Sequence, residues 1–342
     1  MENRTGSAGR RKQAWGNAVA TKPKVLITRR WPEAVEAKLK ETYDVTLNES
    51  DVPMTVDEIR QALNDYDAVC PTVSDKVDAA ALAVEAPRAK ILASYGVGYS
   101  HIDTEAAKKA GLVVTNTPEV LSGCTADLAI TLMLMAARRA GEGEREVRAG
   151  KWTGWRPTHM IGTKVSGGVF GVLGFGRIGR EAAKRAHFGF GMKVIYFDAY
   201  PVKPELAAET GAEARDSIEA VLAEADVVSL HMPGGKENYH LISTERLKLM
   251  KPTAILVNTA RGEVVDGVAL AAALEAGTIA GAGLDVFEGE PKIVPELLAT
   301  EKAVLLPHLG SATLATREAM GWRVMDNLEA FFKGETPKDR VA

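Results

Sequence analysis

The sequence predicts an α/β protein with two doubly wound parallel sheets, of Rossmann-like or flavodoxin-like architecture. From Lys24 onward, short apolar runs of strand length alternate with segments that have the pattern of helices. Helices between successive strands imply right-handed crossovers and parallel sheets that are covered on both faces. The alternation is interrupted by a Gly-, Trp- and Pro-rich stretch at residues 150–157 and restarts at Gly168. The length of 342 residues also agrees with two units, because a domain usually has about 100–200 residues.

In the first half of the chain, strands are expected at residues 25–27, 43–47, 67–73, 90–95 and 112–115. The helices between them are expected from Pro32, from Thr55, over residues 77–86 and over residues 104–110. Thr55 and Glu58 have the spacing of a capping box, in which each side chain binds the backbone N–H of the other residue. Gly111 is the residue type that commonly ends a helix.

In the second half, one long amphipathic helix is expected over residues 122–148. Strands are expected near residues 169–173, 193–197, 226–230, 254–258, 280–284 and 303–306. The last helix is expected over residues 312–333.

The composition excludes several classes of protein. Lys plus Arg number 42 and Asp plus Glu 45, so the formal net charge of −3 indicates neither a nucleic-acid partner nor a membrane surface. The uncharged run Leu128 to Ala137 has ten residues, whereas a membrane-spanning helix needs about 20. The only two cysteines, Cys70 and Cys124, cannot form a disulfide framework, so a reducing, cytoplasmic compartment is expected. Residues 1–22 are arginine-rich, lack the apolar segment of a secretory signal and are expected to form a disordered extension.

A glycine-rich loop follows the strand expected at residues 169–173. It comprises Gly174, Phe175, Gly176, Arg177, Ile178 and Gly179, which is the G-x-G-x-x-G spacing at the start of an expected helix. The first glycine permits a tight turn, the second lets a pyrophosphate approach the backbone, and the third allows close packing of helix on strand. The helix N-terminus adds free N–H groups and a positive dipole end for phosphate. This context favours a dinucleotide site over a chance cluster of glycines.

An acidic residue ends the next strand. Asp198 lies 19 residues after Gly179, close to the spacing of ~20 at which a carboxylate binds the adenosine ribose hydroxyls. A carboxylate repels a 2′-phosphate, and Ala199 and Tyr200 provide no arginine to receive one. NAD is therefore predicted as the cofactor in preference to NADP.

Three further residues, Arg261, Glu290 and His308, follow expected strands at the sheet edge where ligands bind in open α/β sheets. Hydride transfer to a ketone needs a proton donor for the oxygen and a positive charge that holds the substrate. A histidine that is hydrogen-bonded to a carboxylate has a raised pKa, which suits it to act as general acid near neutral pH. Arginine can bind a carboxylate through two hydrogen bonds. Each residue alone is also consistent with a structural role, but together with a dinucleotide site they predict a catalytic group.

Five segments of the sequence resemble D-2-hydroxyacid dehydrogenases, and most of all the glyoxylate/hydroxypyruvate reductase branch of that family. The segments are residues 94–103, 174–179, 258–262, 283–291 and 307–313, and they run in the order and at the spacing of the family. The resemblance covers about residues 24–333.

The resemblance implies a role for individual residues. Arg261 would bind the carboxylate and carbonyl of the substrate, His308 would be the acid/base, and Glu290 would orient His308 and raise its pKa. The backbone at Val97 and Gly98 would hold the substrate carboxylate, because glycine permits a close approach. Asp285 matches the residue that binds the nicotinamide amide. The other positions that match residues lining the cofactor are Thr125, His231, Met232, Pro233, Thr259, Ala260 and His308.

The resemblance also implies how the chain is divided. The cofactor domain, residues 122–308, would be inserted into a substrate domain formed by residues 23–121 and 309–342. The helix expected over residues 122–148 resembles the dimer-forming element of the family, so a homodimer is expected. A core helix within one domain would have the same pattern.

The function that the resemblance implies is the reduction of a small 2-oxo acid, of the glyoxylate or hydroxypyruvate type, by hydride transfer from NADH. The product would be the D-2-hydroxy acid. Glu290 disfavours formate dehydrogenases, which have glutamine at this position. Phosphoglycerate and lactate dehydrogenases of the family stay as alternatives, as does an NAD-sensing corepressor that binds partners without catalysis. Dispersed histidines and the lack of H-E-x-x-H, G-x-S-x-G and P-loop motifs disfavour metalloenzymes and hydrolases, and no metal is predicted.

Overall fold

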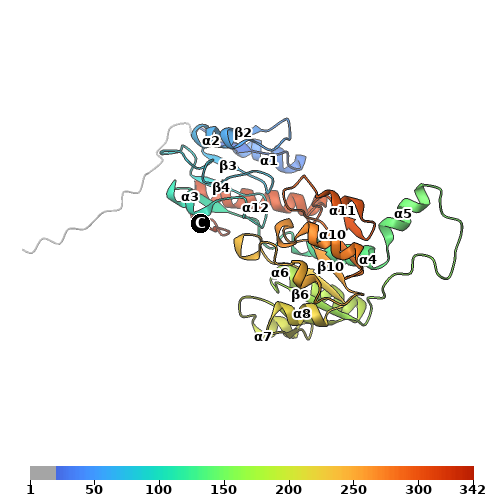
Figure 1. The fold of residues 1–342 in the computed structure, drawn as a ribbon. Coiled ribbons are helices and arrows are strands. Elements are labelled where there is room, and N and C mark those ends of the chain that lie inside the picture. Colours follow the sequence, from blue (N-terminus) through green and yellow to red (C-terminus); the bar gives the residue numbers. More distant parts are fainter. Residues whose placement is uncertain (1–20) are drawn as a thin grey trace, which may run out of the picture.

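The computed structural model describes residues 21–342, which contain two parallel sheets (Figure 1). The α/β fold class predicted from the sequence is therefore confirmed. Residues 1–20 lie outside the described residues, so the disordered extension expected over residues 1–22 stays a prediction. Within the described range, no helix combines the length and the apolar character that a bilayer crossing requires.

The first sheet has five strands in the order β2-β1-β3-β4-β5, and every neighbouring pair is parallel. The strands are β1 (Lys24–Ile27), β2 (Asp44–Leu47), β3 (Ala68–Cys70), β4 (Ile91–Ala93) and β5 (Val113–Thr115). The helices between them are α1 (Glu33–Thr42), α2 (Val56–Asp65) and α3 (Thr104–Lys109). The capping box expected at Thr55 forms, and the turn after α3 contains Gly111 at a left-handed φ of 75°.

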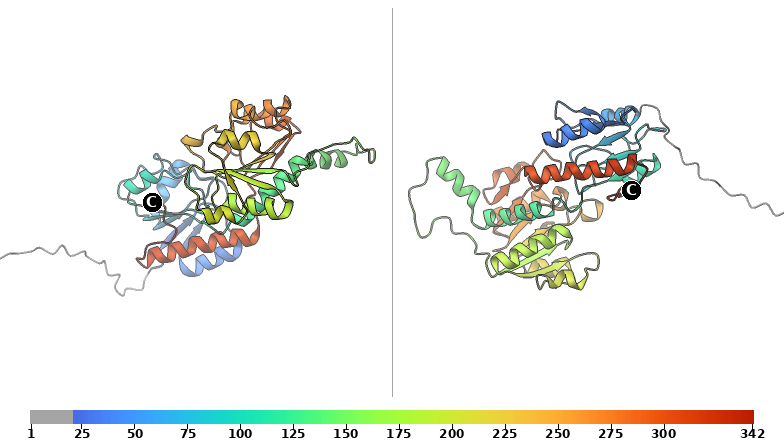
Figure 2. Two further views of the ribbon diagram at one scale, coloured as in Figure 1. Left: turned by 90° about the horizontal axis from the view of Figure 1, so that it is seen from below. Right: turned by 180° about the vertical axis from the view of Figure 1, so that it is seen from behind.

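The two faces of the first sheet bury alternate residues of its strands, as the period of two in a strand requires. Val25 and Ile27 pack with α1 and with the long helix α12 (Leu314–Phe332), whereas Leu26 packs with α2 and α3. Gly321 of α12 lies so close to α1 that a Cβ there would be 2.6 Å from Cγ1 of Val35. The C-terminal helix is thus part of the core of the first sheet (Figure 2).

The second sheet has seven strands in the order β12-β11-β10-β9-β6-β7-β8. The strands are β6 (Val169–Leu173), β7 (Lys193–Phe197), β8 (Glu213–Ala214), β9 (Val227–Leu230), β10 (Ile255–Asn258), β11 (Gly281–Leu284) and β12 (Ala303–Leu305). The chain runs outward from β6 to β8 and then returns to β9 on the other side of β6. The order of the strands therefore reverses between β6 and β9, which is where ligands bind in such sheets.

Helices cover both faces of the second sheet. On one face lie α4 (Ser122–Ala137) and α6 (Arg177–Lys184), and on the other α8 (Ile218–Glu224) and α10 (Gly267–Glu275). The other regular segments are the π turn η1 (Arg185–Gly189), α7 (Pro204–Ala208), the 3-10 turn η2 (Lys236–Asn238), α9 (Thr244–Leu247), the 3-10 turn η3 (Gly262–Val264) and α11 (Pro295–Ala299). α4 lies so close to β11 that a Cβ on Gly283 would be 2.7 Å from Cβ of Leu132.

The helix expected over residues 77–86 does not form, and this prediction was wrong. The backbone N–H of Val77 donates to the carbonyl of His101 at 2.9 Å, and the carbonyl of Val77 accepts from Asp103 at 2.9 Å. The side chain of Asp78 then accepts the N–H groups of Ala80 and Ala81, both at 3.0 Å. Both backbone groups of Val77 are thus used in pairing with a distant segment, and tertiary contacts override the helix propensity of the alanines.

The single helix expected over residues 122–148 is broken into α4 and α5 (Ala140–Arg148). The break occurs at Arg139, whose φ of 54° is left-handed. The carbonyl of Ala137 accepts the N–H of Thr163 at 2.8 Å, so it is not available to a continuing helix. α4 is buried along much of its length, whereas α5 contains no buried residue and extends away from the sheet (Figure 1).

Candidate active site

The carboxyl ends of the two sheets meet at the side chain of Arg261. A Cβ built on Gly98, in the loop after β4, would lie 1.7 Å from Nη2 of Arg261, in the loop after β10. Only a glycine fits against the guanidinium group in this arrangement. Val97 and Gly98, predicted to bind substrate, therefore lie beside the arginine predicted for the same task.

Arg261, Glu290 and His308 follow β10, β11 and β12, which are neighbours in the second sheet. The structure brings Glu290 and His308 into contact, with 2.9 Å between Oε2 of Glu290 and Nδ1 of His308. The other carboxylate oxygen of Glu290 accepts the N–H of Phe287 at 2.9 Å. Because an ionised carboxylate only accepts, the proton of this contact lies on Nδ1, and Nε2 is left to exchange a proton with a ligand.

Glu290 remains ionised at this site. Burial raises the pKa of its carboxyl, but the hydrogen bond and the charge of His308 lower it, as do the N–H of Phe287 and the charge of Arg261. The lowering effects prevail, so the pKa of Glu290 lies below its ordinary value. The carboxylate is therefore available to stabilise a positive charge on the imidazole of His308.

Arg261 is held in place by its own turn. Its Nη1 donates to the carbonyl of Ala260 at 2.7 Å. Burial lowers the pKa of the guanidinium group, and the negative charges of Glu263 and Glu290 oppose this shift. The group keeps its charge, because an arginine guanidinium is not deprotonated in proteins, and it is a partly desolvated cation next to the Gly98 backbone.

The predicted glycine loop follows β6 at the point where the strand order reverses. Gly174 has a left-handed φ of 89°, and a Cβ there would lie 2.7 Å from the carbonyl carbon of His231. A Cβ on Gly179 would lie 2.2 Å from the carbonyl oxygen of Gly174, so the helix α6 begins in close contact with the loop. The space beside Gly176 is open. Arg177 and Ile178 belong to the first turn of α6, whose N–H groups have no partner within the helix.

Asp198 contacts the glycine loop directly. Its Oδ2 accepts the N–H of Phe175 at 2.7 Å, and its Oδ1 accepts the N–H of Tyr200 at 2.9 Å. The carboxylate therefore stabilises the loop from the end of β7. No arginine follows it in the sequence up to residue 214.

Other residues predicted to line the cofactor lie at the ends of β9 and β10. His231, Met232 and Pro233 follow β9, and Thr259 and Ala260 follow β10. Nδ1 of His231 and Oγ1 of Thr259 are buried and have no hydrogen-bond partner among the described residues. Buried polar atoms of this kind usually have a partner, so these two atoms fit a site that receives a polar ligand such as a dinucleotide.

Asp285 and Thr125 lie at the base of this region and bind the turn that follows His308. The carboxylate of Asp285 accepts the N–H of Leu309 at 2.6 Å and that of Gly310 at 2.8 Å. Oγ1 of Thr125 donates to the carbonyl of Gly310 at 3.1 Å. Burial raises the pKa of Asp285, and the two amides and the charge of His308 oppose this shift. Asp285 therefore also positions the backbone of the proposed acid/base.

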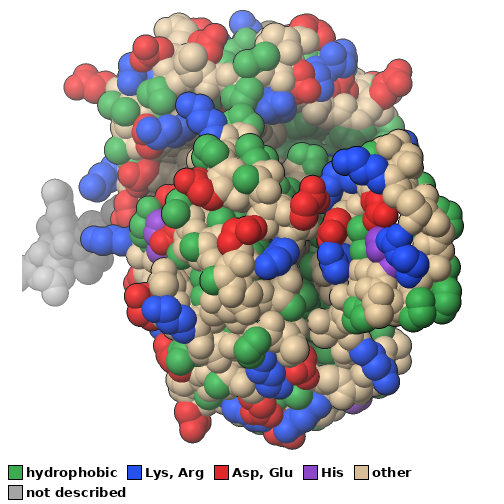
Figure 3. Space-filling view, turned by 45° about the vertical axis from the view of Figure 1, so that its right-hand side comes forward, with side chains coloured by type: hydrophobic (Ala, Val, Ile, Leu, Met, Phe, Trp, Pro, Cys, Tyr) green, Lys and Arg blue, Asp and Glu red, His purple; other side chains and the backbone are tan. Residues whose placement is uncertain are grey.

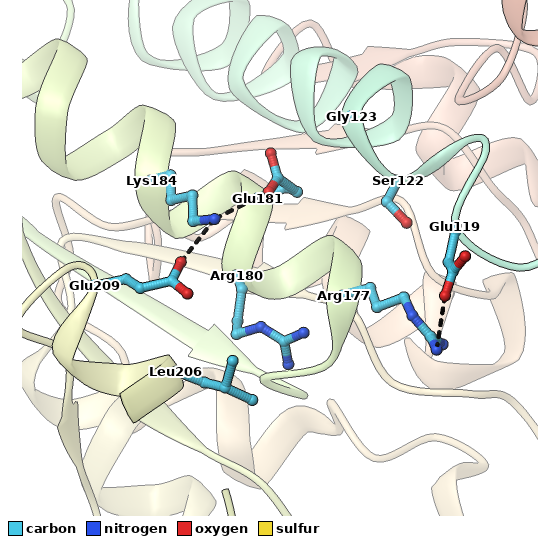
Figure 4. A pocket seen from close by; sticks show the side chains of 9 residues that line it. All are labelled: Glu119, Ser122, Gly123, Arg177, Arg180, Glu181, Lys184, Leu206 and Glu209. Atoms are coloured by element: carbon cyan, nitrogen blue, oxygen red, sulfur yellow. Dashed lines mark hydrogen bonds and ion pairs between the residues drawn. The ribbon is translucent and has the colours of Figure 1, made fainter. Parts of the chain in front are cut away.

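A pocket beside the glycine loop is lined by both signs of charge (Figure 4). Its basic side chains are Arg177, Arg180 and Lys184, and its acidic side chains are Glu119, Glu181 and Glu209. Arg177 lies 3.4 Å from Glu119, and Lys184 lies 2.7 Å from Glu209. On the face shown in Figure 3, acidic and basic groups are also interspersed. An anionic ligand would therefore be held by local groups and not by a general positive field.

Two residues at the site were given no role from the sequence. Oδ1 of Asn258 accepts the N–H of Ala260, and its Nδ2 donates to the carbonyl of Arg261, both at 2.9 Å. Asn258 thus shapes the turn that carries Arg261, and the tendency of asparagine to bind backbone two residues onward was an available signal. His101 has its Nε2 3.3 Å from Oγ of Ser94, and burial together with the charge of Arg261 lowers its pKa to about 4. No local pattern indicated its proximity to Arg261.

Comparisons with known proteins show the family of the chain. The sequence model of the family described as "D-isomer specific 2-hydroxyacid dehydrogenase, NAD binding domain" matches residues 130–310. A glyoxylate reductase of Thermococcus litoralis is 48% identical over 324 residues, which cover 94% of this chain and 97% of that protein.

Solved structures with the same fold include members of the same family. A putative D-isomer-specific 2-hydroxyacid dehydrogenase from Polaromonas has a TM-score of 0.87 and 34% identity, with 94% of this chain and 100% of that chain covered. An NADPH-dependent glyoxylate/hydroxypyruvate reductase from Sinorhizobium meliloti, in complex with NADP and malonate, has a TM-score of 0.81 and 32% identity, covering 94% and 97% of the two chains. The resemblance noted in the sequence is thereby confirmed. The chain belongs to the D-isomer-specific 2-hydroxyacid dehydrogenase family.

Proposed function

We propose that this protein reduces a small 2-oxo acid, of the glyoxylate or hydroxypyruvate type, to the corresponding D-2-hydroxy acid. The observation that carries the proposal is the meeting of Arg261 with the Gly98 backbone near the His308–Glu290 pair. A 2-oxo acid has a carboxylate and an adjacent carbonyl, and this arrangement provides a cation with backbone N–H groups for the first and a proton donor for the second. The printed names of relatives such as the Thermococcus litoralis enzyme support the same substrate class.

Arg261 and the backbone of Val97 and Gly98 would bind the substrate carboxylate. An arginine can donate two parallel hydrogen bonds to a carboxylate, and such charge-assisted bonds are the strong ones. Because Arg261 is partly buried, solvent screens its charge less than at the surface. Closure of the two units over the substrate would exclude water further.

His308 would supply the proton that the carbonyl oxygen gains. NADH, when bound, supplies the hydride that reaches C2 of the substrate. Nε2 of His308 gives its proton to the oxygen, so that the C=O group becomes CH–OH and atoms and charges balance. The ionised Glu290, 2.9 Å from Nδ1, stabilises the protonated imidazole before transfer.

For the cofactor, we propose NAD in preference to NADP, on the basis of Asp198. Its carboxylate lies beside the glycine loop, where a 2′-phosphate would meet a like charge. The Sinorhizobium meliloti relative is described as NADPH-dependent, so members of this fold differ in this property.

We also propose the division of the chain and its assembly. A substrate domain of residues 23–121 and 309–342 is supported by the packing of α12 on the first sheet, and residues 122–308 would form the cofactor domain.

A homodimer is supported by α5 and the segment after it, which expose Trp152, Trp155 and Ile161 at 54%, 82% and 68%. A reducing, cytoplasmic location is supported by Cys70 and Cys124, which are free.

The test is the oxidation of NADH or NADPH, followed by absorbance, with glyoxylate, hydroxypyruvate, pyruvate, phenylpyruvate and 3-phosphohydroxypyruvate. We expect turnover of glyoxylate or hydroxypyruvate with NADH. Preference for pyruvate or 3-phosphohydroxypyruvate would identify a lactate- or phosphoglycerate-type enzyme instead. Absence of turnover with every acid would favour a binding protein.

A further inference from the structure

We propose that Asn116 is a positioning residue for the substrate loop, and that it directs the N–H of Gly98 toward the substrate carboxylate. This inference rests on the proposed function, in which the Val97–Gly98 backbone binds that carboxylate. Asn116 follows β5, the neighbour of β4, whose own end leads into the loop. The side chain of Asn116 is buried at the base of that loop.

Two successive carbonyls of the loop are held by two successive residues after β5. Nδ2 of Asn116 donates to the carbonyl of Val97 at 2.8 Å. The backbone N–H of Thr117 donates to the carbonyl of Gly96 at 3.0 Å. The loop is therefore fixed along one side, by one side-chain amide and one backbone amide.

Because the peptide bond is planar, holding the carbonyl of Val97 also fixes the direction of the N–H of Gly98. The Val97–Gly98 bond is trans, so the N–H of Gly98 points opposite to the carbonyl that Asn116 holds. Neither the N–H of Val97 nor that of Gly98 has an acceptor among residues 21–342. A Cβ on Gly98 would be 1.7 Å from Nη2 of Arg261, so the backbone of Gly98 lies next to the cation. Free N–H groups beside a guanidinium group suit an anion with two oxygens.

Asn116 is itself fixed by the C-terminal part of the chain. Its carbonyl accepts from Nδ2 of Asn327 in α12 at 3.3 Å, and its N–H donates to the carbonyl of Asp339 at 3.2 Å. The carboxylate of Asp339 binds Nη2 of Arg323 at 2.9 Å and Nδ2 of Asn327 at 3.1 Å. Asn116 therefore connects α12 to the loop through hydrogen bonds on both sides. This role needs no contact between Asn116 and the substrate.

The test is the variant Asn116→Ala, assayed with glyoxylate and NADH. Loss of the donor lets the Val97–Gly98 peptide rotate, and an aligned hydrogen bond to a charged group is lost, so KM for glyoxylate should rise about tenfold. The turnover number should change by less than about threefold, because the interaction acts equally on bound substrate and transition state. The dissociation constant of NADH should stay the same. Asn116→Ser, which has a shorter donor, should give an intermediate KM.

A matched control is Asn48→Ala. Nδ2 of Asn48 also donates to backbone carbonyls, those of Thr28 at 2.8 Å and Val52 at 2.7 Å, but at the opposite edge of the same sheet. This variant should lose a similar amount of stability and keep its KM for glyoxylate. A folded Asn116→Ala protein with an unchanged KM would overturn the inference. Lack of turnover of both glyoxylate and hydroxypyruvate by the unaltered enzyme would instead overturn the proposed function.

A second measurement does not depend on the folding of Asn116→Ala. In the unaltered enzyme with NADH, oxamate, an unreactive analogue of a 2-oxo acid, should slow hydrogen exchange of the Gly98 N–H by at least about tenfold. In Asn116→Ser the protection should be smaller at the same oxamate occupancy. Equal protection in both proteins, or none in either, would contradict the role of Asn116.

Discussion

The glycine loop after β6 and the glycine loop after β4 begin alike, each at the carboxyl end of a parallel strand. The loop at residues 174–179 leads into α6, so it includes the N–H groups of a helix N-terminus, which have no partner within the helix. The loop at residues 96–98 is separated from the next helix, α3, by residues 99–103, and its Gly98 backbone lies beside the guanidinium of Arg261. One loop would receive a dinucleotide phosphate and the other a small carboxylate.

The same backbone groups are thus oriented in two different ways. At the first loop the helix fixes the direction of the N–H groups and adds its dipole, and Asp198 accepts the N–H of Phe175. At the second loop the direction comes from Asn116 and the charge from Arg261, a residue of the other sheet. Variants at the first loop should therefore change cofactor binding alone, and variants at the second should change substrate binding alone.

The largest effect is expected from His308→Gln, which belongs to neither loop. The variant loses the proton donor, so the turnover number should fall by about 10²–10⁴, while the dissociation constants of NADH and oxamate change little. Stopped-flow absorbance and fluorescence titration measure these quantities. His240→Gln is the control, because His240 also pairs with a carboxylate, that of Glu288 at 2.7 Å. Near-normal turnover by His308→Gln would remove His308 from the mechanism.

Arg261→Gln tests the second loop. It removes a partly buried cation that would bind the substrate carboxylate, so kcat/KM for glyoxylate should fall by about 10²–10³. NADH affinity should stay within about twofold. Arg177→Gln, at the first loop, should show the reverse pattern, with weaker NADH binding and an unchanged KM for glyoxylate. If both variants weakened the binding of both NADH and glyoxylate, the two loops would not be separate sites.

Asp198→Asn tests the first loop. The amide can still accept the N–H of Phe175 through its oxygen, but it no longer repels a phosphate. We expect the ratio of kcat/KM for NADH to that for NADPH to fall about tenfold, with glyoxylate KM unchanged. Steady-state kinetics with each cofactor provide the ratio. A ratio that did not move would show that another group selects the cofactor.

The smallest effect concerns two partly buried histidines, His101 and His231, one near each loop. Burial lowers the pKa of His231 to about 4, and burial followed by the charge of Arg261 does the same for His101. The unfolded pKa is about 6.5, so between these values the unfolded chain binds protons that the folded chain does not. The unfolding free energy therefore falls as the pH falls from about 6.5 to about 4.

Replacement of either histidine should reduce this dependence. From pH 6 to pH 5, each histidine should lower the unfolding free energy by about 1 kcal/mol. In His101→Asn or His231→Asn, this part of the decrease should be absent. Urea denaturation at the two pH values measures it. Arg261→Gln should reduce the contribution of His101 and leave that of His231 unchanged. An identical pH dependence in all four proteins would mean that these histidines are already charged when folded.

The first loop could be predicted from the sequence because its determinants are local. The glycine spacing, the helix start at Arg177 and Asp198 lie within one β-α-β unit. The contact of Glu290 with His308 was also expected, from the resemblance to a known family. Its 2.9 Å distance and the anchoring of Glu290 by Phe287 were not accessible.

The parts that could not be predicted depend on contacts between distant segments. Arg139 interrupts a helix because the carbonyl of Ala137 is taken by Thr163, which lies on a returning segment. Asn116 acts on Val97 from a neighbouring strand and is itself held by Asn327, more than two hundred residues later. Neither a propensity nor a spacing in one stretch of sequence contains such information.

The contact of Thr125 with Gly310 has a consequence for protein engineering. Their 3.1 Å hydrogen bond means that the chain enters α4 and leaves toward α12 at adjacent points. A segment whose two ends touch can be replaced as a single cassette without stretching the host structure around it. Chimeras that exchange residues 126–309 between relatives would keep this junction, so cofactor preference could be transplanted together with Arg261, Glu290 and His308, while residues 96–98, Asn116 and α12 would stay unchanged.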